Sequence, residues 1–463
     1  MRILVKNIIN KEGEQVELMG WVATRRNHGK IIFIDLRDRS GIVQAVFTPA
    51  NKEIYELAEQ LRTEWVIKII GQASRRPEKM KNPEIETGDF EIQVENLEIL
   101  NQAETPPLAV DTDGYEIGEE VRLKYRYLDL RRPRLQKNLK MRAKIIKFIR
   151  DFLTERDFVE VETPILGKST PEGARDYLVP SRLQPGNFYA LPQSPQQYKQ
   201  LLMVAGLERY FQIAKCFRDE DTRGDRQPEF TQLDLEMSFV DEKEIINLTE
   251  ELLTALVEKF FPNKKFCKKP FHQEAYGHLL EKHNSDKPDI RNDINNDNEL
   301  AFLWVVDFPL FEYSETEKKL VSTHHLFTAP QKNDEKLLDS EPEKIKAQAY
   351  DIVLNGFEIG GGSIRIHQRN LQEKIFKILG LKKEDYEKQF GHLLEAFGYG
   401  TPPHGGIALG IDRLLAILLD EPNIRETIAF PKTGDGRDLM MQAPSEVDEK
   451  QLKELNIKIN KKL

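Results

Sequence analysis

The chain has 463 residues, of which 39% are hydrophobic and 31% charged, and its net charge is −9. This length exceeds one ordinary domain, and the apolar fraction excludes a largely disordered chain. No stretch approaches the roughly 18 consecutive apolar residues of a spanning helix, which argues against a membrane protein. The acidic total excludes a uniformly basic surface but allows a local basic patch that binds nucleic acid.

Cysteine content and the first residues bear on the cellular compartment. Cys216 and Cys267 are the only two cysteines, too few for a disulfide framework or a cysteine zinc site. Lys6 and Asn7 interrupt the short apolar start, which therefore does not match a signal peptide. We expect a reduced, cytoplasmic environment.

The first hundred residues predict a small β-barrel. Residues 15–47 alternate at period two between Asn/Gly and Ser/Gly turns, which indicates three consecutive antiparallel strands. A short helix at 52–61 and strands at 65–73 and 90–99 follow. Five strands with a helix between the third and fourth are typical of an OB-fold, which commonly binds oligonucleotides. A generic small barrel is the alternative.

A linker and a basic stretch follow the barrel. Residues 101–121 are polar and contain Pro106 and Pro107, as a linker would. Residues 123–150 contain a single acid, Asp129, and their second half has the apolar spacing of an amphipathic helix. Either the basic side chains form a solvated face or part of them contacts phosphate.

From 157 to 413 the pattern predicts an α+β domain with a mainly antiparallel sheet, because long strands alternate with helices without regular βαβ spacing. The Asn/Asp-rich stretch near 284–299 predicts an exposed loop. We expect helices at 194–205, 244–261, 343–355 and 371–379.

Three segments of this domain carry polar residues suited to a nucleotide. In CFRDEDTRGDRQPEF, Arg218 and Arg226 flank Glu220, and guanidinium groups grip phosphate bidentately. Asp351 and Glu358 precede a glycine-rich strand and could hold Mg²⁺ on phosphates, since Mg²⁺ takes few protein carboxylates. Each segment alone has a plainer reading, as a solvated hairpin tip or as surface acids.

The third segment is GTPPHGGIALGIDR, where glycines allow a ligand close to the backbone and Arg413 begins a helix. Glycine-rich turns from strand to helix are common, so this segment alone is not specific. The sequence GxxxxGK[ST] is absent, so a P-loop does not supply nucleotide binding.

Taken together, RYLDLRRP, VETPILGKSTPEGARDYLVPSR, CFRDEDTRGDRQPEFTQLD, WVVDFPLF, FEIGGGSIRIH and GTPPHGGIALGIDR resemble the class II aminoacyl-tRNA synthetases, and among them the bacterial-type aspartyl-tRNA synthetases. The resemblance covers nearly the whole chain. It implies an OB-fold anticodon-binding domain at 1–102, a linker at 103–130, a class II catalytic domain at 131–445 and a C-terminal extension at 446–463.

Such enzymes join an amino acid to ATP, release pyrophosphate and transfer the aminoacyl group to tRNA. The resemblance implies that Arg218 is catalytic and holds the α-phosphate and the substrate carboxylate, that Asp351 and Glu358 hold Mg²⁺, and that no prosthetic group is needed. The ATP site it implies comprises Arg218, Asp219, Glu220, Gln227, Glu358, Gly410, Ile411, Asp412 and Arg413.

The resemblance also supplies Lys199 and Arg365 for the side chain of aspartate. Two cations would pair its β-carboxylate and leave the amide donors of asparagine without acceptors. His324 and His325 would lie on a mobile loop over the substrate. The implied aspartate site comprises Glu172, Ser194, Gln196, Lys199, Arg218, Asp234, His324, His325 and Arg365.

In the barrel, the resemblance assigns Phe33 to stacking on an anticodon base and Gln44 to reading a base edge. Without the resemblance, an aromatic residue such as Phe33 would be assigned to the core. Arg25, Arg26 and His28 complete the implied anticodon-binding set, and Pro164 matches a segment at a homodimer interface.

Two departures from the family pattern stand out, and His28 adds a finer resemblance. The extra domain that bacterial-type relatives carry before WVVDFP is replaced here by the loop 284–299. Leu326 stands where relatives usually have proline, so the loop loses a fixed φ. His28 resembles enzymes that charge both tRNA-Asp and tRNA-Asn.

Two alternatives remain at this point. An asparaginyl- or lysyl-tRNA synthetase would share the architecture, but neither an amide nor an ammonium suits the cations Lys199 and Arg365. A catalytically silent RNA-binding paralogue would carry a damaged motif, yet Arg218, Glu220 and Arg413 are present. No separate editing domain is evident.

Overall fold

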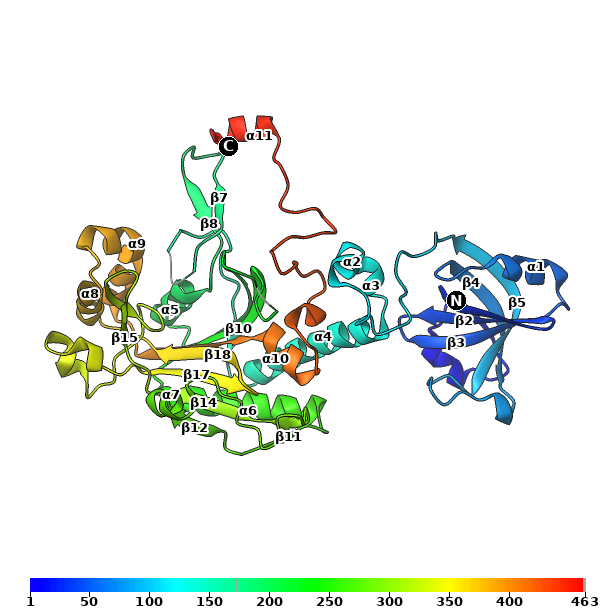
Figure 1. Ribbon diagram of the computed structural model, residues 1–463, viewed down its shortest axis with the longest axis horizontal. Coiled ribbons are helices and arrows are strands. Elements are labelled where there is room, and N and C mark those ends of the chain that lie inside the picture. Colours follow the sequence, from blue (N-terminus) through cyan, green and yellow to red (C-terminus); the bar gives the residue numbers. More distant parts are fainter. Residues whose placement is uncertain (171–173, 223, 461–463) are drawn as a thin grey trace. The chain divides into compact units, whose positions relative to one another are not determined.

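The computed structural model describes residues 1–170, 174–222 and 224–460. It divides into two compact units, Met1–Arg132 and Pro133–Leu463, which Figure 1 colours from blue to red along the chain. Within the described residues, no helix combines the length and the apolar character needed to cross a lipid bilayer.

The first unit contains a closed five-stranded barrel in the order β1-β2-β3-β5-β4, as the sequence predicts for an OB-fold. Period-two alternation along β2 buries Ile32, Ile34 and Leu36, so Phe33 points away from the core. The elements are β1 (Gln15–His28), β2 (Ile31–Asp38), β3 (Gly41–Phe47), α1 (Lys52–Gln60), β4 (Val66–Arg75) and β5 (Phe90–Asn101).

Part of the basic stretch is buried after the barrel, in α2 (Glu119–Lys124), α3 (Arg126–Asp129) and the residues that follow. The Asp129 carboxylate accepts from Nε of Arg122 at 3.1 Å, Nη1 of Arg126 at 2.6 Å and Nε of Arg132 at 2.6 Å. Burial raises the pKa of Asp129, but these guanidinium groups outweigh it and the net pKa is lowered. These arginines therefore have a structural role.

The second unit is built on an eight-stranded sheet in the order β12-β14-β17-β18-β19-β10-β9-β6. Only the pairs β12–β14 and β6–β9 are parallel, which confirms the predicted α+β class. The strands are β6 (Val159–Glu160), β9 (Arg209–Phe217), β10 (Glu229–Ser238), β12 (His272–Ala275), β14 (Phe302–Val306), β17 (Ala349–Leu354), β18 (Phe357–Ile364) and β19 (His404–Gly410).

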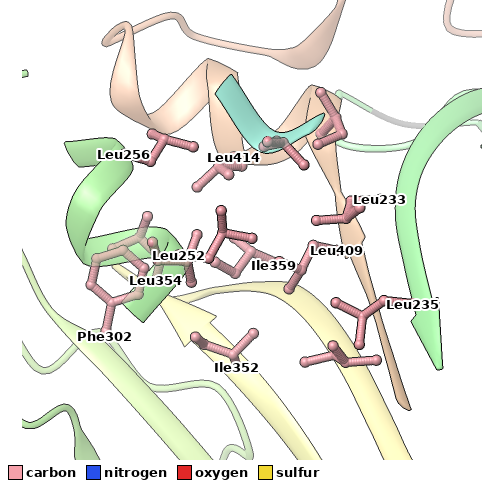
Figure 2. Close-up of a cluster of buried hydrophobic side chains, with 14 of the residues drawn as sticks. Leu233, Leu235, Leu252, Leu256, Phe302, Ile352, Leu354, Ile359, Leu409 and Leu414 are labelled. Carbon is pink, nitrogen blue, oxygen red and sulfur yellow. The ribbon is translucent and has the colours of Figure 1, made fainter. Parts of the chain in front are cut away.

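Three helices, α4 (Pro133–Thr154), α6 (Glu242–Phe260) and α10 (Ile411–Leu418), share one apolar core with the sheet. Figure 2 shows Leu252 and Leu256 of α6 and Leu414 of α10 facing the strand residues of this core. Alternation along β10 sends Leu233 and Leu235 into this core, so Asp234 and Glu236 lie on the opposite face of the sheet.

The predicted helix at 343–355 is wrong. Residues 342–344 form a 3₁₀ turn and Ala349–Leu354 form β17. Tyr350, Ile352 and Leu354 belong to the core with α6, whereas Ala349 and Val353 join the core of the other face, so both faces are apolar. A strand buried on both sides loses the alternation that distinguishes it from a helix.

Of the other helices, α5 and α8 agree with the predictions to within a few residues, whereas α7, α9 and α11 are not predicted by the sequence. These helices are α5 (Gln196–Val204), α7 (Tyr276–His283), α8 (Arg369–Ile378), α9 (Lys383–Ala396) and α11 (Glu449–Glu454). Three two-stranded sheets pair β7 (Leu178–Pro180) with β8 (Phe188–Ala190), β11 (Lys265–Phe266) with β13 (Glu299–Leu300), and β15 (Phe311–Ser314) with β16 (Lys319–Ser322).

The Asn/Asp-rich stretch forms neither helix nor strand from residue 284 to β13, as predicted. Arg291 donates from Nε to Oδ1 of Asp289 at 3.1 Å and from Nη2 to Oδ2 at 2.7 Å. Nη1 of Arg291 also donates to the Asn296 carbonyl at 3.4 Å, so this side chain links two parts of the loop.

Candidate active site

The polar residues of the second unit converge on the face of the sheet opposite α6 and α10. Two glycines make room for them. A Cβ at Gly361 would lie 2.5 Å from Oδ1 of Asp351, and one at Gly406 would lie 2.1 Å from Oε2 of Glu236. The glycine-rich strands predicted to approach a ligand therefore first accommodate two carboxylates of the chain itself.

A buried ionic cluster forms where α5 faces β10. Nζ of Lys199 lies 2.7 Å from Oδ1 of Asp234 and 3.2 Å from Oε2 of Glu236. All three side chains are at most 2% exposed. Desolvation raises the pKa of Asp234, and its Oδ2 has no hydrogen bond from any described residue.

Arg365, just after β18, completes this cluster. Its Nε donates to Oε1 of Glu236 at 2.9 Å, and Nη2 donates to Oε2 at 3.2 Å and to the Gly406 carbonyl at 3.4 Å. Desolvation would raise the pKa of Glu236, but Arg365 and Lys199 lower it to about 2. Glu236 is therefore a carboxylate at any physiological pH.

The remaining nitrogen of Arg365 faces Ser363 and His325. Nη1 donates to Oγ of Ser363 at 2.6 Å and also contacts Nε2 of His325. Oγ of Ser363 lies 3.3 Å from the same Nε2, and the backbone N–H of Phe327 lies 3.1 Å from Nδ1. Burial, together with Arg365, lowers the pKa of His325 well below its usual value, so the ring is neutral. Arg365, Ser363 and His325 therefore form one connected polar group.

His324 faces the predicted metal ligands. Its Nε2 lies 3.1 Å from Oδ1 of Asp351, and burial lowers its pKa less than Asp351 raises it, so the net pKa is raised. Burial and the neighbouring Asp351 raise the pKa of Glu358. The described residues contain no group of three or more His, Cys, Asp or Glu side chains arranged to hold a metal ion.

The predicted nucleotide-binding arginines lie on β9–β10 and α10. The Arg218 guanidinium carbon lies 5.1 Å from the centroid of the Phe230 ring, a cation–π arrangement. Nη2 of Arg413 donates to the Asp225 carbonyl at 3.1 Å, and Nη1 donates to the Glu358 carbonyl. Glu220 lies 3.8 Å from Arg226, and the Asp219 backbone N–H donates to the Arg175 carbonyl at 3.0 Å.

Two side chains of the predicted nucleotide set are engaged within the chain. The Gln227 amide donates to the Lys432 carbonyl at 3.1 Å and accepts from its N–H at 2.7 Å. The Asp412 carboxylate accepts from the Thr231 N–H at 2.8 Å and from Arg142. Gly410 ends β19 and Ile411 begins α10, at the predicted turn from strand to helix.

The remaining predicted aspartate ligands lie at the start of α5. Gln196 is 6% exposed and shares a helix face with Lys199, and Ser194 comes two residues before it. Glu172 lies outside the described residues.

On the barrel, the predicted anticodon residues lie on the outer surface of β1–β3. His28 and Phe33 pack edge to face with centroids 6.0 Å apart. Arg26 donates to Asp35 at 2.8 Å and to Oε1 of Gln44 at 3.4 Å. Arg25 instead donates to the Leu61 carbonyl at 3.1 Å, so its guanidinium is bound at the end of α1.

Pro164, predicted at a dimer interface, is exposed and continues the chain after β6. Its neighbours Ile165 and Leu166 are about half exposed as well.

Sequence reasoning missed Glu236, Ser363 and Phe230. For Glu236 a signal existed, because LDLEM alternates leucine with acid and so places Asp234 and Glu236 on one face. Ser363 and Phe230 had no comparable signal, since their importance comes from contacts with Arg365 and Arg218.

Comparison with known proteins decides the family. The sequence profile of class II tRNA synthetases (D, K and N) matches residues 118–434, more than half of the chain. The chain belongs to this family. It is therefore a ligase of the aminoacyl-tRNA synthetase class, and a profile of the OB-fold nucleic acid binding domain matches residues 16–100.

Curated members of the family are close relatives. The aspartate–tRNA(Asp/Asn) ligase of Syntrophomonas wolfei is 44% identical over 578 aligned positions, which cover 98% of this chain and 98% of that protein. The aspartate–tRNA ligase of Staphylococcus carnosus is 41% identical, covering 96% and 97%. An alignment of 578 positions against 463 residues leaves more than one hundred without a counterpart here, in agreement with the missing insertion domain.

Solved synthetase structures share the fold. The asparaginyl-tRNA synthetase of Pyrococcus horikoshii gives a TM-score of 0.76 at 24% identity, over 94% of this chain and 98% of that one. A putative aspartyl-tRNA synthetase of Leishmania major gives 0.75 at 20% identity, over 93% of each chain.

Proposed function

We propose that this synthetase attaches L-aspartate to tRNA through an aspartyl-adenylate. The observation that carries the proposal is the pair of buried cations, Lys199 and Arg365, on the polar face of the sheet. Both side chains only donate, and a carboxylate oxygen is the strongest acceptor an amino-acid side chain offers. The β-carboxylate of aspartate would accept from both cations.

The same arrangement disfavours the alternative amino acids. An asparagine amide would present its NH₂ group to donors, leaving buried polar groups unpaired. A lysine ammonium would face two cations, Lys199 and Arg365. The acids that could pair with it, Asp234 and Glu236, are already bound to these cations. The aspartate ligand set remains as predicted, namely Glu172, Ser194, Gln196, Lys199, Arg218, Asp234, His324, His325 and Arg365.

For ATP, we assign the α-phosphate to Arg218 and the terminal phosphate to Arg413. The donor set of Asp351 and Glu358 suits Mg²⁺, since burial and the neighbouring Asp351 raise the pKa of Glu358 and a bound cation would offset both effects. When bound, the ion would neutralise phosphate charge. Gln227 and Asp412 would then act by holding residue 432 and the start of β10 beside the nucleotide.

The chemical step requires little covalent work from the protein. An oxygen of the aspartate α-carboxylate forms a bond to the α-phosphorus while the bond to pyrophosphate breaks in line. Arg218 would hold the two reacting groups together and stabilise the charge that develops on the phosphate.

On the barrel, Phe33, Gln44, Arg26 and His28 form an outward surface that suits anticodon bases, with Phe33 stacking and Gln44 reading an edge. His28 supports the charging of both tRNA-Asp and tRNA-Asn. We further propose a cytoplasmic homodimer that buries the exposed segment around Pro164.

The first test is aspartate charging of purified tRNA-Asp and tRNA-Asn, side by side. Charging of both supports a relaxed anticodon reader, whereas charging of tRNA-Asp alone removes the role given to His28. Charging of neither, with no aspartate-dependent ATP–pyrophosphate exchange, would establish the silent paralogue. Exchange with asparagine or lysine instead would overturn the assignment of aspartate.

The role of Arg218 has its own test. Arg218→Ala is expected to lower exchange by about 10²–10³-fold, the typical effect of removing one donor to a developing charge. Full activity in a folded variant would remove this arginine from the mechanism.

A further inference from the structure

Behind the proposed aspartate site, three buried side chains form a hydrogen-bonded row. Nε2 of Gln196 donates to Oε1 of Gln200 at 3.1 Å, one turn further along α5. Nε2 of Gln200 lies 3.2 Å from Nε2 of His404 on β19, and Nδ1 of His404 lies 2.8 Å from the Pro402 carbonyl. None of the three side chains is more than 6% exposed.

Chemistry fixes the direction of every bond in this row. The Pro402 carbonyl can only accept, so Nδ1 of His404 carries a proton. Burial lowers the pKa of His404 to about 4, so the ring is neutral and its Nε2 is an acceptor. Gln200 must then donate to His404 and accept from Gln196.

The last amide in the row is therefore held in one orientation. Nε2 of Gln196 is engaged with Gln200, and its Oε1 receives no hydrogen bond from any described residue. With the opposite orientation of Gln200, its Oε1 would face the lone pair on Nε2 of His404, and the row would contain an acceptor–acceptor contact. The neutral tautomer of His404 thus determines which atom Gln196 offers to the site.

We propose that Gln200 and His404 are positioning residues that hold the Gln196 amide oxygen toward the α-ammonium of the substrate. The inference rests on the proposed function. At neutral pH aspartate has one donor group, its ammonium, while both carboxylates only accept. A fixed acceptor at the start of α5 therefore recognises the ammonium, while Lys199 on the same helix and Arg365 after β18 take a carboxylate.

Succinate separates this role from a structural one, because it has both carboxylates of aspartate and lacks the ammonium. Calorimetric titration of the full chain gives the dissociation constants of aspartate and succinate for each variant. Gln200→Met keeps the side-chain length and removes both hydrogen bonds. It is expected to weaken aspartate binding roughly 10- to 100-fold, the cost of losing a charge-assisted hydrogen bond, with little change for succinate.

His404 supplies a graded pair of variants. His404→Leu removes the acceptor and frees Gln200 to rotate, so the preference for aspartate over succinate should fall. His404→Gln can place an acceptor near the lost Nε2, so the preference should largely return. Thr249→Val in α6 removes another buried hydrogen bond, from Oγ1 to the Ile245 carbonyl at 2.8 Å, and should leave the preference as it is.

Equal losses for aspartate and succinate in Gln200→Met and His404→Leu would overturn the inference, because they would indicate general damage to the site. An unchanged preference in both variants would overturn it as well. Failure of the proposed function looks different, since the wild-type protein would then bind neither ligand measurably.

Discussion

The two units meet their proposed ligands with opposite kinds of surface. In the catalytic unit, Lys199, Glu236 and Arg365 are at most 2% exposed and are bound to one another. On the barrel, His28 is exposed and Phe33 lies outside the core, on the outward face of β2.

The difference reflects the size and charge of what is recognised. A small zwitterion can be distinguished from its amide only where water is excluded, because there an unpaired donor or charge is costly. A nucleic acid base arrives with a broad ring face, and an outward aromatic side chain can stack on it without being buried beforehand. Substitutions should therefore damage stability in the catalytic unit and tRNA affinity in the barrel.

The largest effect is expected for Glu236→Gln. The change removes one charge from a buried network and leaves Lys199 and Arg365 short of a partner, which should lower the free energy of unfolding by about 3–5 kcal/mol. Urea denaturation can be followed through Trp304, which is buried in this unit, in a background where Trp21 and Trp65 are replaced by phenylalanine.

The control is Glu258→Gln, which breaks the exposed ion pair with Lys269. It should lower the free energy of unfolding by no more than about 1 kcal/mol. Equal losses in the two variants would contradict the contrast between buried and exposed charges.

A pH-dependent effect of about 3 kcal/mol is expected from His404. Its pKa is about 4 in the folded chain and about 6.5 when unfolded, so the unfolded state binds the extra proton as pH falls between these values. Stability should therefore decline from pH 6.5 toward 4. The pKa of Glu236 is about 2 in the folded chain, so the stability that this carboxylate contributes is lost only below pH 4.5.

His404→Gln should flatten the upper part of this decline in urea titrations at several pH values. The charged and titratable groups that act on His404 are Glu236, Arg365 and His367, and they remain in the variant. An identical pH dependence in the two proteins would show that folding does not change the pKa of His404.

For the barrel, Phe33→Ala should weaken tRNA binding by about 1–3 kcal/mol, the usual contribution of one base stacked on an aromatic ring. Filter binding or fluorescence titration with tRNA measures this loss. Tyr313→Ala removes an aromatic side chain of β15 that is 56% exposed, and it serves as the matched control. Equal losses in the two variants would argue against a specific stacking site.

The smallest effect concerns the choice of tRNA. His28→Leu removes the edge-to-face contact with Phe33, and such contacts contribute about 0.5–1.5 kcal/mol. The ratio of charging rates for tRNA-Asn and tRNA-Asp should fall by a corresponding factor. A ratio that does not move would assign the selectivity to other residues of the barrel.

Much of the fold was predictable because its patterns are local. The barrel followed from alternation and turns, and the start of α10 followed from the glycines before it. The segment 343–355 was misassigned because β17 is buried on both faces, so its apolar residues fit a helix as well as a strand. Only the neighbouring strands β14 and β18 decide between the two.

For the site, the motifs supplied the residues but not their mutual contacts. Arg365 was expected to face a substrate carboxylate, and the structure adds that Glu236 already binds it. The row from Gln196 to His404 joins residues about 200 positions apart, a distance over which no sequence pattern operates. The hydrogen bonds that Gln227 and Asp412 make within the chain also join residues far apart in the sequence, so they could not be predicted from it either.

The order of strands in the large sheet has a consequence for synthesis on the ribosome. β19 is the last strand of this sheet to be made, yet it lies between β18 and β10, and among the described strands it alone pairs with both halves of the sheet. Until residue 410 has emerged, each half has an unpaired edge and Glu236 lacks the neighbouring strand that carries Gly406. The nascent chain therefore completes this domain only near the end of translation, when long-range pairing is slow and exposed edges invite aggregation. Fragments released before β19 should accordingly be inactive and prone to degradation.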